Sequence, residues 1–394
     1  MAPHPVRHSV LNGIDLLDLA PFAASHEHDL FRRLRDEAPV HFNSEPDGPG
    51  FWSLTRYDHV LAAARDHGRL LSGHGTQIMA RRAEGAGHAS VHNSDPPLHG
   101  RLRNIVLPSL SRGAIAKREG RIGEIARALV DEAPLWDRFD FVEDIAVKLP
   151  MLVIADVLGV PAEDAARLVD WANAMSDVRA TNAEQADART ALFAYFRSLA
   201  AAKRAQPGDD VASALVAADM ADDALDAYFM LLTVAGNETT RFLITGGLAQ
   251  LARQPEAFDR VKADQSLIAP MIEEMCRHVS PVGHMRRTMA EDCDLFGTPV
   301  RKGDKVVLWF ASANRDERQF STPDLLTVDR NPNPHIGFGQ GAHFCVGAHL
   351  ARLESRLFFE AFFDRVSQVE LIGEPERLPS NWFTGWTAMQ VRWS

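Results

Sequence analysis

The sequence predicts a mainly α-helical protein that carries small β-sheets at one side. Helical patterns dominate the chain of 394 residues, and one of them, Ala224–Arg253, is long and largely apolar. Strand-like segments are short and gather near residues 40–55 and 294–310. A hydrophobic content of 46% is enough for a large core. Because we find no linker, internal repeat or low-complexity tract, we expect one domain over residues 1–394, with residues 1–25 as an irregular N-terminal segment.

The N-terminal half is expected to pass from short mixed elements into a run of helices. Apolar residues at helical spacing predict the helices, and β-branched or aromatic residues between turn residues predict the strands. The first elements are a helix at His28–Glu37, strands at Val40–Asn43 and Phe51–Thr55, a helix at His59–Asp66 and a long Gly-, His- and Arg-rich loop at Ser72–Ser94. Helices follow at Pro97–Leu110, Arg121–Asp131, Val142–Leu158, Ala162–Met175 and Ala183–Ala205.

The C-terminal half is expected to contain the central helix. Ala224–Arg253 is apolar around most of its circumference, which is typical of a buried helix. It is followed by a helix at Pro270–Val279, strands at Asp294–Phe296, Pro299–Arg301 and Lys305–Phe310, a helix at Ala348–Phe363 and a last strand at Thr387–Trp393.

The composition argues against several classes of function. The net charge of −11 argues against nucleic acid as a partner and gives no basic stripe for anionic membranes. Three cysteines do not form a disulfide framework, which fits a reducing compartment. Met1–Pro21 lacks the pattern of a signal peptide, and the most apolar stretch, Tyr228–Gly236, is too short to span a bilayer. We therefore expect a soluble cytoplasmic protein without a membrane span.

A glycine-rich segment places one cysteine directly before a helix. Phe338–Gly347 reads Phe-Gly-Gln-Gly-Ala-His-Phe-Cys-Val-Gly, and Cys345 should lie at the N-terminus of the helix that follows. The helix dipole and the free backbone N–H groups there favour a thiolate, which is a strong ligand for haem iron. Flanking glycines let the backbone lie flat against a large planar cofactor.

Other interpretations of this segment are weaker. A free cysteine is most often a small buried hydrophobic residue. A glycine-rich turn before a helix can also bind phosphate, but the Lys-Ser/Thr pair of a P-loop is absent and Phe344 stands where a dinucleotide motif needs glycine. A zinc site built on Cys345 and His349 would need two more ligands, and nothing links His88 and His92 to it.

A second set of polar residues lies inside the apolar central helix. Ala235-Gly236-Asn237-Glu238-Thr239-Thr240 puts a carboxylate and hydroxyls where they are costly unless they have partners. Gly236 weakens the helix by about 1 kcal/mol relative to alanine. Together they indicate a local opening that could hold water or a ligand. The alternative is that Thr239 bonds back to the carbonyl four residues earlier and that Glu238 reaches towards a loop.

These two segments resemble motifs of the cytochrome P450 family. Phe338–Gly347 matches Phe-Gly-x-Gly-x-His-x-Cys-x-Gly, and Ala235–Thr239 resembles Ala/Gly-Gly-x-Asp/Glu-Thr. The resemblance implies a soluble bacterial-type haem-thiolate monooxygenase with a P450-like fold around a long central helix. It implies haem b as the cofactor and Cys345 as the axial iron ligand. Catalytic Thr239 would form a hydrogen bond in the oxygen pocket, and catalytic Glu238 would relay protons. The other residues expected along the haem are Ala235, Gly236, Phe338, Gly339, Gly341 and Gly347.

The resemblance also implies which side chains hold the haem propionates. His99 and Arg103 are four residues apart on one helix face and are similar to the family's His-x-x-x-Arg pair. Arg287 stands where the family places a propionate arginine, and we prefer it to Arg286. His343 belongs to the cysteine segment itself.

The resemblance implies a structural triad before the cysteine segment. Glu274 and Arg277 are three residues apart and share a helix face, and Arg330 follows. In the family such a Glu-Arg-Arg set locks the helix to the segment that precedes the cysteine. On residue types alone, a surface Glu-x-x-Arg pair is common and contributes less than roughly 1 kcal/mol.

Substrate and redox partner can be assigned only by region. The expected pocket is apolar and aromatic, which favours a compact hydrophobic substrate such as a terpenoid, an aromatic or a steroid-like molecule. Its expected lining residues are Phe229, Leu232, Thr233, Val282, His284 and Phe383, with His284 and Arg81 as candidates for binding a polar substituent. No flavin, nicotinamide or ferredoxin motif is found, so electrons would come from a ferredoxin and its reductase. Candidate docking cations are Arg101, Arg112, Lys117, Arg118, Arg352 and Arg356, although scattered solvated charges would look the same.

The resulting prediction is a monooxygenase that hydroxylates its substrate with O2 and two electrons. Two alternatives remain open: a peroxide-driven peroxygenase of the same fold, and a haem-binding sensor without catalysis. The pair Glu238-Thr239 argues against both, because neither needs a proton relay in a buried helix.

Overall fold

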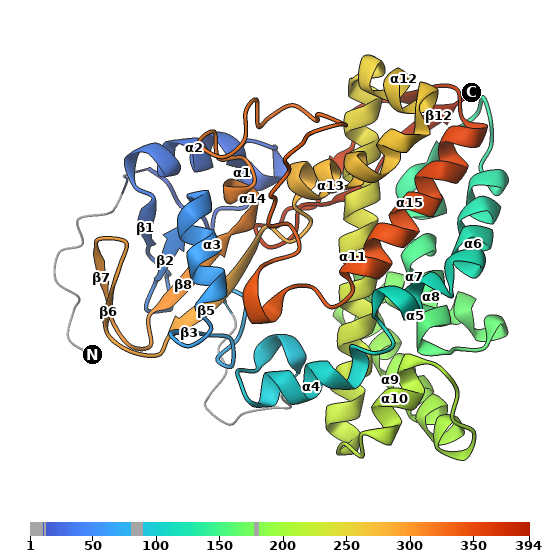
Figure 1. Ribbon diagram of the computed structural model, residues 1–394, viewed down its shortest axis with the longest axis horizontal. Coiled ribbons are helices and arrows are strands. Elements are labelled where there is room, and N and C mark those ends of the chain that lie inside the picture. Colours follow the sequence, from blue (N-terminus) through green and yellow to red (C-terminus); the bar gives the residue numbers. More distant parts are fainter. Residues whose placement is uncertain (1–10, 12, 80–89, 177–180) are drawn as a thin grey trace.

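The computed structural model describes residues 11, 13–79, 90–176 and 181–394. A part that carries most of the β-structure lies beside a larger helical part, and the long helix α11 (Asp222–Arg253) runs through the helical part (Figure 1). Residues 80–89 of the expected Ser72–Ser94 loop, with Arg81 and His88, lie outside the described residues. Within the expected irregular N-terminal segment, Ala20–Ala23 forms the helical turn α1.

The main sheet brings together strands from both ends of the chain. Its order is β1-β2-β8-β5-β3, in which β2 and β8 are parallel and the other pairs are antiparallel. The strands are β1 (Val40–Asn43), β2 (Phe51–Leu54), β3 (Leu70–Leu71), β5 (His284–Met289) and β8 (Lys305–Trp309). Every residue of β2 and β8 is buried, which fits strands that are apolar except for Ser53 and Lys305.

Three smaller sheets complete the β-structure. They pair β4 (Arg138–Asp140) with β12 (Gln390–Trp393) and β9 (Val369–Leu371), β10 (Glu376–Arg377) with β11 (Trp386–Ala388), and β6 (Cys293–Leu295) with β7 (Thr298–Val300). The single strand expected at Thr387–Trp393 was wrong, because the chain changes sheets at Met389. Its first part pairs with β10 and its second with β4 and β9.

Most of the expected helices are present, and their bounds differ from the expected ones by a few residues. They are α2 (Glu27–Glu37), α3 (Tyr57–Arg65), α4 (Leu98–Val106), α6 (Glu119–Glu132), α7 (Lys148–Leu158) after a π-helical segment η2 (Val142–Ala146), α8 (Ala162–Ser176), α9 (Asn182–Ala205), α13 (Ile268–Val279) and α15 (Ala348–Arg365). Helices that we did not expect are α5 (Arg112–Ala116), α10 (Val211–Ala217), α12 (Pro255–Ala263) and α14 (Phe310–Ala313), and strand β5 was also missed.

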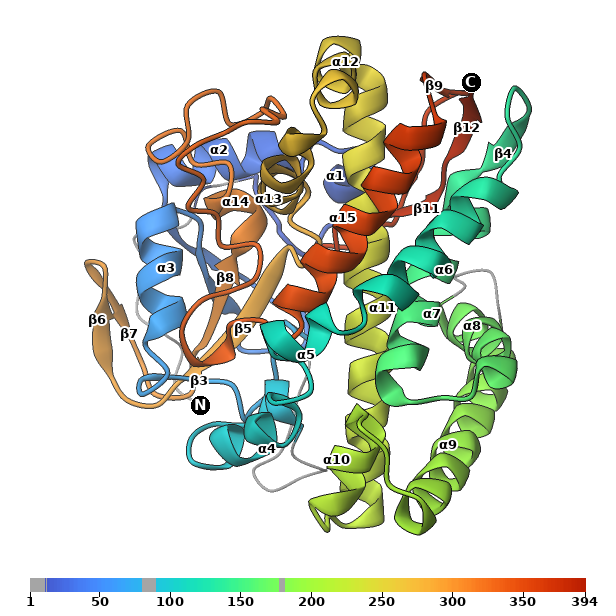
Figure 2. The same cartoon turned by 45° about the vertical axis from the view of Figure 1, so that its right-hand side comes forward.

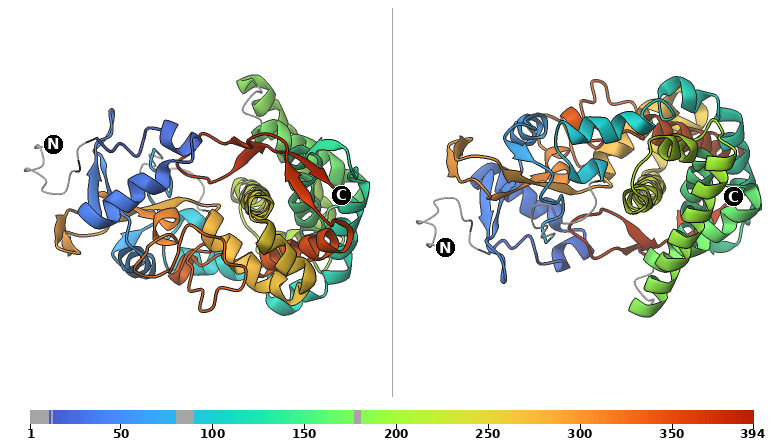
Figure 3. Two further views of the ribbon diagram at one scale, coloured as in Figure 1. Left: turned by 90° about the horizontal axis from the view of Figure 1, so that it is seen from above. Right: turned by 90° about the horizontal axis from the view of Figure 1, so that it is seen from below.

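Helix α11 is the centre of the helical part. Seen along its axis, α11 is surrounded by other elements (Figure 3). Helices α7, α9 and α10 contact it on the side shown in Figure 2, whereas α8 packs on α7 and α9, and α6 packs on α15 and α7. Gly246 and Gly247 allow this close packing, since a Cβ on them would lie 2.4 Å from the Trp386 ring and 2.3 Å from the Met275 sulfur. The helix therefore holds its polar residues at a fixed position in the core.

The described residues include no helix that is both long enough and apolar enough to cross a membrane. Helix α11 has the length, but its polar residues interrupt the apolar surface that a lipid-exposed span requires.

Candidate active site

The cysteine segment forms a tight loop between the main sheet and α15. Gly339 and Gly341 adopt positive φ values of +69° and +72°, and a Cβ on Gly341 would lie 2.7 Å from the carbonyl oxygen of Ala64. The loop closes where the backbone N–H of Cys345 donates to the carbonyl of Phe338 over 2.9 Å. A side chain at either position would be strained by the positive φ, and at Gly341 it would also clash with the backbone of Ala64.

Cys345 precedes α15, as expected, but its environment differs from the expectation. Cys345 has exposed surface, but that surface lines an internal cavity and the thiol lies deep within the protein. Burial raises the pKa of the Cys345 thiol, and this outweighs the backbone N–H of Gly347 that acts in the opposite direction. The helix N-terminus alone therefore does not stabilise a thiolate here. A bound cation such as iron would, because coordination deprotonates a thiol outright.

The cavity above Cys345 is walled mainly by apolar side chains. One wall is a stripe of α11 at helical spacing: Leu231, Leu232, Ala235, Gly236, Thr239, Thr240 and Leu243. Val91, Leu110, Pro150, Ile154, Val282, Met285 and Phe310 cover other sides, and the cysteine loop from Gly337 to Gly347 contributes all residues except Gly341 and Ala342. The thiol of one element and the hydroxyls of another thus line the same apolar space.

Two guanidinium groups in the cavity wall have no anionic partner within the described residues. Arg287 is 5% exposed, and its one hydrogen bond in this part of the chain goes to the carbonyl of Arg286 over 2.9 Å. Burial lowers the pKa of Arg287 to about 10. Arg103 also lines the cavity without an ion pair. A buried cation is costly unless a counter-charge is supplied, so the wall fits a ligand with carboxylates.

Two neutral histidines lie beside the arginines of this wall. His99 and His343 both line the cavity, and their ring centroids are 4.2 Å apart. His343 Nε2 lies 3.1 Å from the hydroxyl of Ser72, and burial together with Arg287 lowers its pKa to about 3. Arg286 points elsewhere, since its guanidinium donates to the carbonyls of Gly75 and His74. Of the two adjacent arginines, Arg287 is the one that lines the cavity.

The acid and the alcohol of α11 do not both face the cavity. Thr239 lines it, but the Thr239 hydroxyl donates to the carbonyl of Ala235 over 2.8 Å. Glu238 is not part of the lining, and its carboxylate pairs with Arg241. The alternative of a back-bonded threonine therefore describes the structure. For Glu238, the pair with Arg241 means that its carboxylate is not a free relay group.

The opening expected at Gly236 was wrong. Helix α11 is continuous from Asp222 to Arg253. The missing side chain of Gly236 makes room for Ile154, whose Cδ1 would lie 3.2 Å from a Cβ there. Glycine thus serves close packing against α7 rather than a break in the helix.

One buried acid in the cavity was missed. Glu354 on α15 is 2% exposed, lines the cavity and hydrogen-bonds to the side chain of Thr240. Burial raises its pKa to about 8. The sequence contained a signal for it, because Glu354 interrupts the apolar stripe Leu350, Leu357, Phe358 and Ala361 on one helix face.

The side chains of the expected triad are in contact. Glu274 accepts hydrogen bonds from Arg277 Nε and Nη2, each over 2.7 Å, and both side chains are 0% exposed. Arg330 Nε lies 3.0 and 2.9 Å from the two oxygens of the same carboxylate. Arg277 also donates to the carbonyls of Asn314, Pro323 and Leu325. The set joins α13 to the segment that leads to the cysteine loop.

Of the six expected substrate contacts, Leu232 and Val282 line the cavity and four do not. Phe229 stacks on Phe196 at 4.8 Å between ring centroids. Thr233 bonds back to the carbonyl of Phe229.

The other two misplaced contacts lie near the C-terminal turn. His284 is 1% exposed, packs against Trp309 and has its Nδ1 2.9 Å from the carbonyl of Asn381. Phe383 packs against Trp382 and Phe242. For these four residues the sequence gives the region but not the neighbour that covers each side chain.

Half of the expected docking cations are engaged in ion pairs. Arg118 pairs with Asp156, Arg352 with Glu273, and Arg356 with Glu119 and Glu360. The other three, Arg101, Arg112 and Lys117, are exposed and make no ion pair in the described part of the chain. We call these three residues the basic patch.

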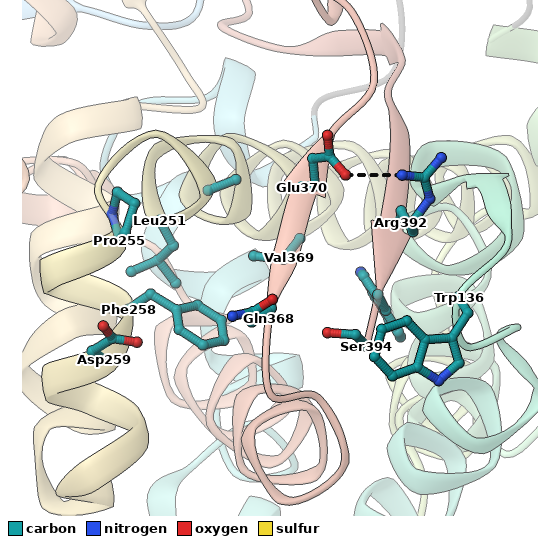
Figure 4. A pocket seen from close by; sticks show the side chains of 12 residues that line it. Trp136, Leu251, Pro255, Phe258, Asp259, Gln368, Val369, Glu370, Arg392 and Ser394 are labelled. Carbon is teal, nitrogen blue, oxygen red and sulfur yellow. Dashed lines mark hydrogen bonds and ion pairs between the residues drawn. The ribbon is translucent and has the colours of Figure 1, made fainter.

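A second pocket lies at the far end of the helical part, near the C-terminal strand (Figure 4). Its lining includes Trp136, Phe258 and Gln368, and its Arg392 is paired with Glu370 over 3.1 Å. It contains no cysteine and none of the candidate residues, so the chemistry of the chain is concentrated in the first cavity.

Known proteins that are similar to this chain in sequence and fold are cytochromes P450, and several are named monooxygenases or hydroxylases. The cytochrome P450 family model matches residues 199–380. Linalool 8-monooxygenase of Pseudomonas putida is 36% identical over 384 residues, which cover 92% of this chain and 95% of that protein. Methyl-branched lipid omega-hydroxylase of Mycobacterium bovis is 39% identical, with 92% and 90% covered. A Mycobacterium marinum cytochrome P450 solved in complex with pseudoionone has a TM-score of 0.90 at 34% identity, with 100% of both chains covered. The chain therefore belongs to the cytochrome P450 family and is a cytochrome P450 monooxygenase.

Proposed function

We propose that this protein hydroxylates a compact hydrophobic small molecule, using haem b, O2 and two electrons from a ferredoxin and its reductase. One observation carries the proposal: Cys345, Thr239 and the unpaired guanidinium of Arg287 line the same apolar cavity. A thiol, a hydroxyl and cations without a counter-charge are the groups that a haem with two propionates and a reactive distal face would use.

The residues of the cavity suit haem in a defined way. Cys345 would bind the haem iron through its sulfur, and His99, Arg103, Arg287 and His343 would hold the propionates. Phe338 and Gly339 of the loop, and Ala235 and Gly236 of α11, would lie along the ring, where small or flat groups leave space. Gly341 and Gly347 would shape the turn on either side of the sulfur. In this arrangement the triad of Glu274, Arg277 and Arg330 keeps the loop in place.

Haem supplies the binding and reductive activation of O2 and the transfer of one oxygen atom to a C–H bond. The chain supplies what surrounds this chemistry. Thr239 can turn its hydroxyl from the Ala235 carbonyl into the cavity, because its side chain already lines it. Glu238 can pass on a proton only after it separates from Arg241. The apolar walls exclude bulk water, so protons arrive through these few groups rather than at random.

Support for the substrate class comes from the walls and from the relatives. Leucine, valine, proline and phenylalanine side chains line the part of the cavity beside α11. The relatives are named for a terpene alcohol and a methyl-branched lipid, and the solved neighbour holds pseudoionone. We infer a terpenoid, aromatic or steroid-like substrate with few polar groups.

The basic patch supports a protein electron donor. An acidic ferredoxin would be attracted to Arg101, Arg112 and Lys117 on the surface of α4 and α5. We further propose that residues 1–394 form one domain and that the protein works in the cytoplasm, where its free cysteines would remain reduced.

A peroxide-driven peroxygenase is the second candidate. It is favoured by the pairing of Glu238 with Arg241 and the back-bonded Thr239, because such an enzyme needs no relay of protons to O2. A haem-binding sensor without catalysis is the third reading and has no such observation in its favour.

One set of assays separates these functions. A panel of terpenoids, aromatics and steroids is screened for a change from low-spin to high-spin haem, and each compound that binds is incubated with NADH, a ferredoxin and its reductase. We expect an oxygenated product that depends on NADH and O2. Product formed with peroxide but not with NADH would indicate the peroxygenase, and binding without any product would indicate the sensor.

A further inference from the structure

Arg352 and Glu273 form a two-pronged ion pair behind the cysteine loop. Arg352 lies on α15 and Glu273 on α13, and they meet through Nε–Oε1 at 2.6 Å and Nη2–Oε2 at 2.8 Å. Their side chains are 34% and 32% exposed, so the pair is only partly screened by water. Burial alone would raise the pKa of Glu273, but the hydrogen bonds from Arg352 and His335 lower it to about 2. The carboxylate is therefore charged at any physiological pH.

His335 is the third member of this network. Its Nε2 lies 3.1 Å from Glu273 Oε2, and its Nδ1 accepts the backbone N–H of Gly337 over 3.2 Å. Because Nδ1 is an acceptor, Nε2 carries the hydrogen and donates to the carboxylate. The network thus holds the backbone immediately before the cysteine loop.

Arg352 also contacts the first residue of the loop directly. Its guanidinium carbon lies 4.4 Å from the centroid of the Phe338 ring, which is a cation–π contact. The carbonyl of Phe338 in turn accepts the backbone N–H of Cys345 over 2.9 Å. A short chain of contacts therefore runs from the ion pair through Phe338 to the cysteine.

The charge of Arg352 lies close to the backbone that carries the sulfur. Its guanidinium contacts the ring of Phe338, whose carbonyl is bonded to the backbone N–H of Cys345. The hydrogen bond to Glu273 raises the pKa of Arg352, so the guanidinium stays charged. The two neighbouring acids on α13 differ in role, since Glu274 faces Arg277 and Arg330 whereas Glu273 faces α15 and the loop.

We propose that Arg352, oriented by Glu273 and His335, is a positioning residue that fixes Phe338 and sets the electrostatic potential at Cys345. The inference rests on the proposed function, in which Cys345 binds the iron. It gives Arg352 a role in holding the loop rather than in docking a partner, because the Nε and Nη2 groups of its guanidinium already bind the Glu273 carboxylate. Arginine is required, since lysine can neither form the paired hydrogen bonds to Glu273 nor place a planar cation over the Phe338 ring.

The test compares three variants and a control as purified haem-loaded proteins. Arg352→Gln removes the cation, Arg352→Lys keeps the charge but not the paired hydrogen bonds to Glu273, and Glu273→Gln removes the anion. Arg356→Gln is the control, because Arg356 lies one turn further along α15 and pairs with Glu119 and Glu360 instead. The readouts are the midpoint potential and the lifetime of the red-shifted band of the reduced carbon monoxide complex, which reports thiolate ligation.

Opposite shifts in potential are expected from the two charge removals. Arg352→Gln should favour the oxidised protein by about threefold in the one-electron equilibrium, or about 28 mV, since tenfold corresponds to 59 mV. Glu273→Gln should shift the potential the other way. Arg352→Lys should keep the wild-type potential, but its thiolate band should decay several-fold faster, as in both other variants. Arg356→Gln should match wild type in both readouts.

Two results would overturn the inference. One is an Arg352→Gln protein with wild-type potential and band lifetime. The other is a shift in the same direction for Arg352→Gln and Glu273→Gln, which would indicate general damage to the loop. If Arg352→Gln does not retain haem, the inference is tested by the potential of Glu273→Gln and the band lifetime of Arg352→Lys. Wild-type values of both would overturn it. A wild-type protein without the red-shifted band would instead refute the proposed function, so the two failures are distinguishable.

Discussion

Replacing Glu274 by glutamine should remove a large part of the stability of this protein. The Glu274 carboxylate accepts hydrogen bonds from Arg277, Arg330, the backbone N–H of Thr327 and the side chain of Asn333. Arg277 is 0% exposed, so a neutral partner leaves its guanidinium charged and without water. Breaking a buried pair in this way costs about 3–5 kcal/mol. That is roughly a third of a typical free energy of unfolding of about 5–15 kcal/mol.

The loss can be measured by urea unfolding of the haem-loaded protein, together with the ratio of haem to protein after purification. We expect a free energy of unfolding lower by about 3–5 kcal/mol for Glu274→Gln. For Glu274→Ala and Arg277→Ala we expect little or no haem-loaded protein. The control is Glu124→Gln, whose exposed pair with Arg121 should contribute less than about 1 kcal/mol. Normal haem content and a Glu274→Gln stability within about 1 kcal/mol of wild type would refute the reasoning.

Four further predictions concern the cavity and the surface. Thr239→Ala should release more hydrogen peroxide per NADH oxidised, because the cavity hydroxyl is lost; unchanged coupling of NADH to product would speak against its role. Arg287→Gln should lose haem to apomyoglobin at least about tenfold faster, since a charge-assisted hydrogen bond contributes about 1.5–3 kcal/mol; a wild-type rate would contradict this. Ferredoxin-driven turnover should fall steeply with added salt if the basic patch docks the partner, and a flat response would argue against it. Glu354 holds a proton up to about pH 8 in the folded protein but loses it near pH 4.5 in the unfolded chain. Between these values the free energy of unfolding of wild type should therefore fall by about 1.4 kcal/mol per pH unit relative to Glu354→Gln, as measured by urea unfolding. A difference between these two proteins that is independent of pH would show that the acid is not buried in its neutral form.

Local sequence patterns were sufficient for the cysteine loop and the central helix. The glycines at 339 and 341 are required by backbone geometry, and that requirement is visible in the residues themselves. The length of α11 follows from an apolar pattern that contains no proline and continues past Gly236 and the pair Gly246-Gly247. Such features depend on neighbours in the chain, which a single sequence contains.

Features that depend on distant contacts were not predictable. Glu273 meets Arg352 across 79 positions, and nothing in the local pattern around either residue indicates the other. Strand β5 was missed because its residues include His284, Arg286 and Arg287, which are polar and become buried only when β8 and the segment at His74–Thr76 cover them. Strands β11 and β12 were predicted as one strand, because the change of sheets at Met389 depends on partner strands that lie far away in the sequence.

The central claim is that the sulfur of Cys345 binds iron inside the cavity. It is tested most directly by the absorption spectrum of the dithionite-reduced protein under carbon monoxide, recorded on wild type and on Cys345→Ser. We predict the red-shifted band typical of thiolate ligation in wild type and its loss in the variant. A natively folded wild type whose spectrum resembles that of myoglobin would contradict the account.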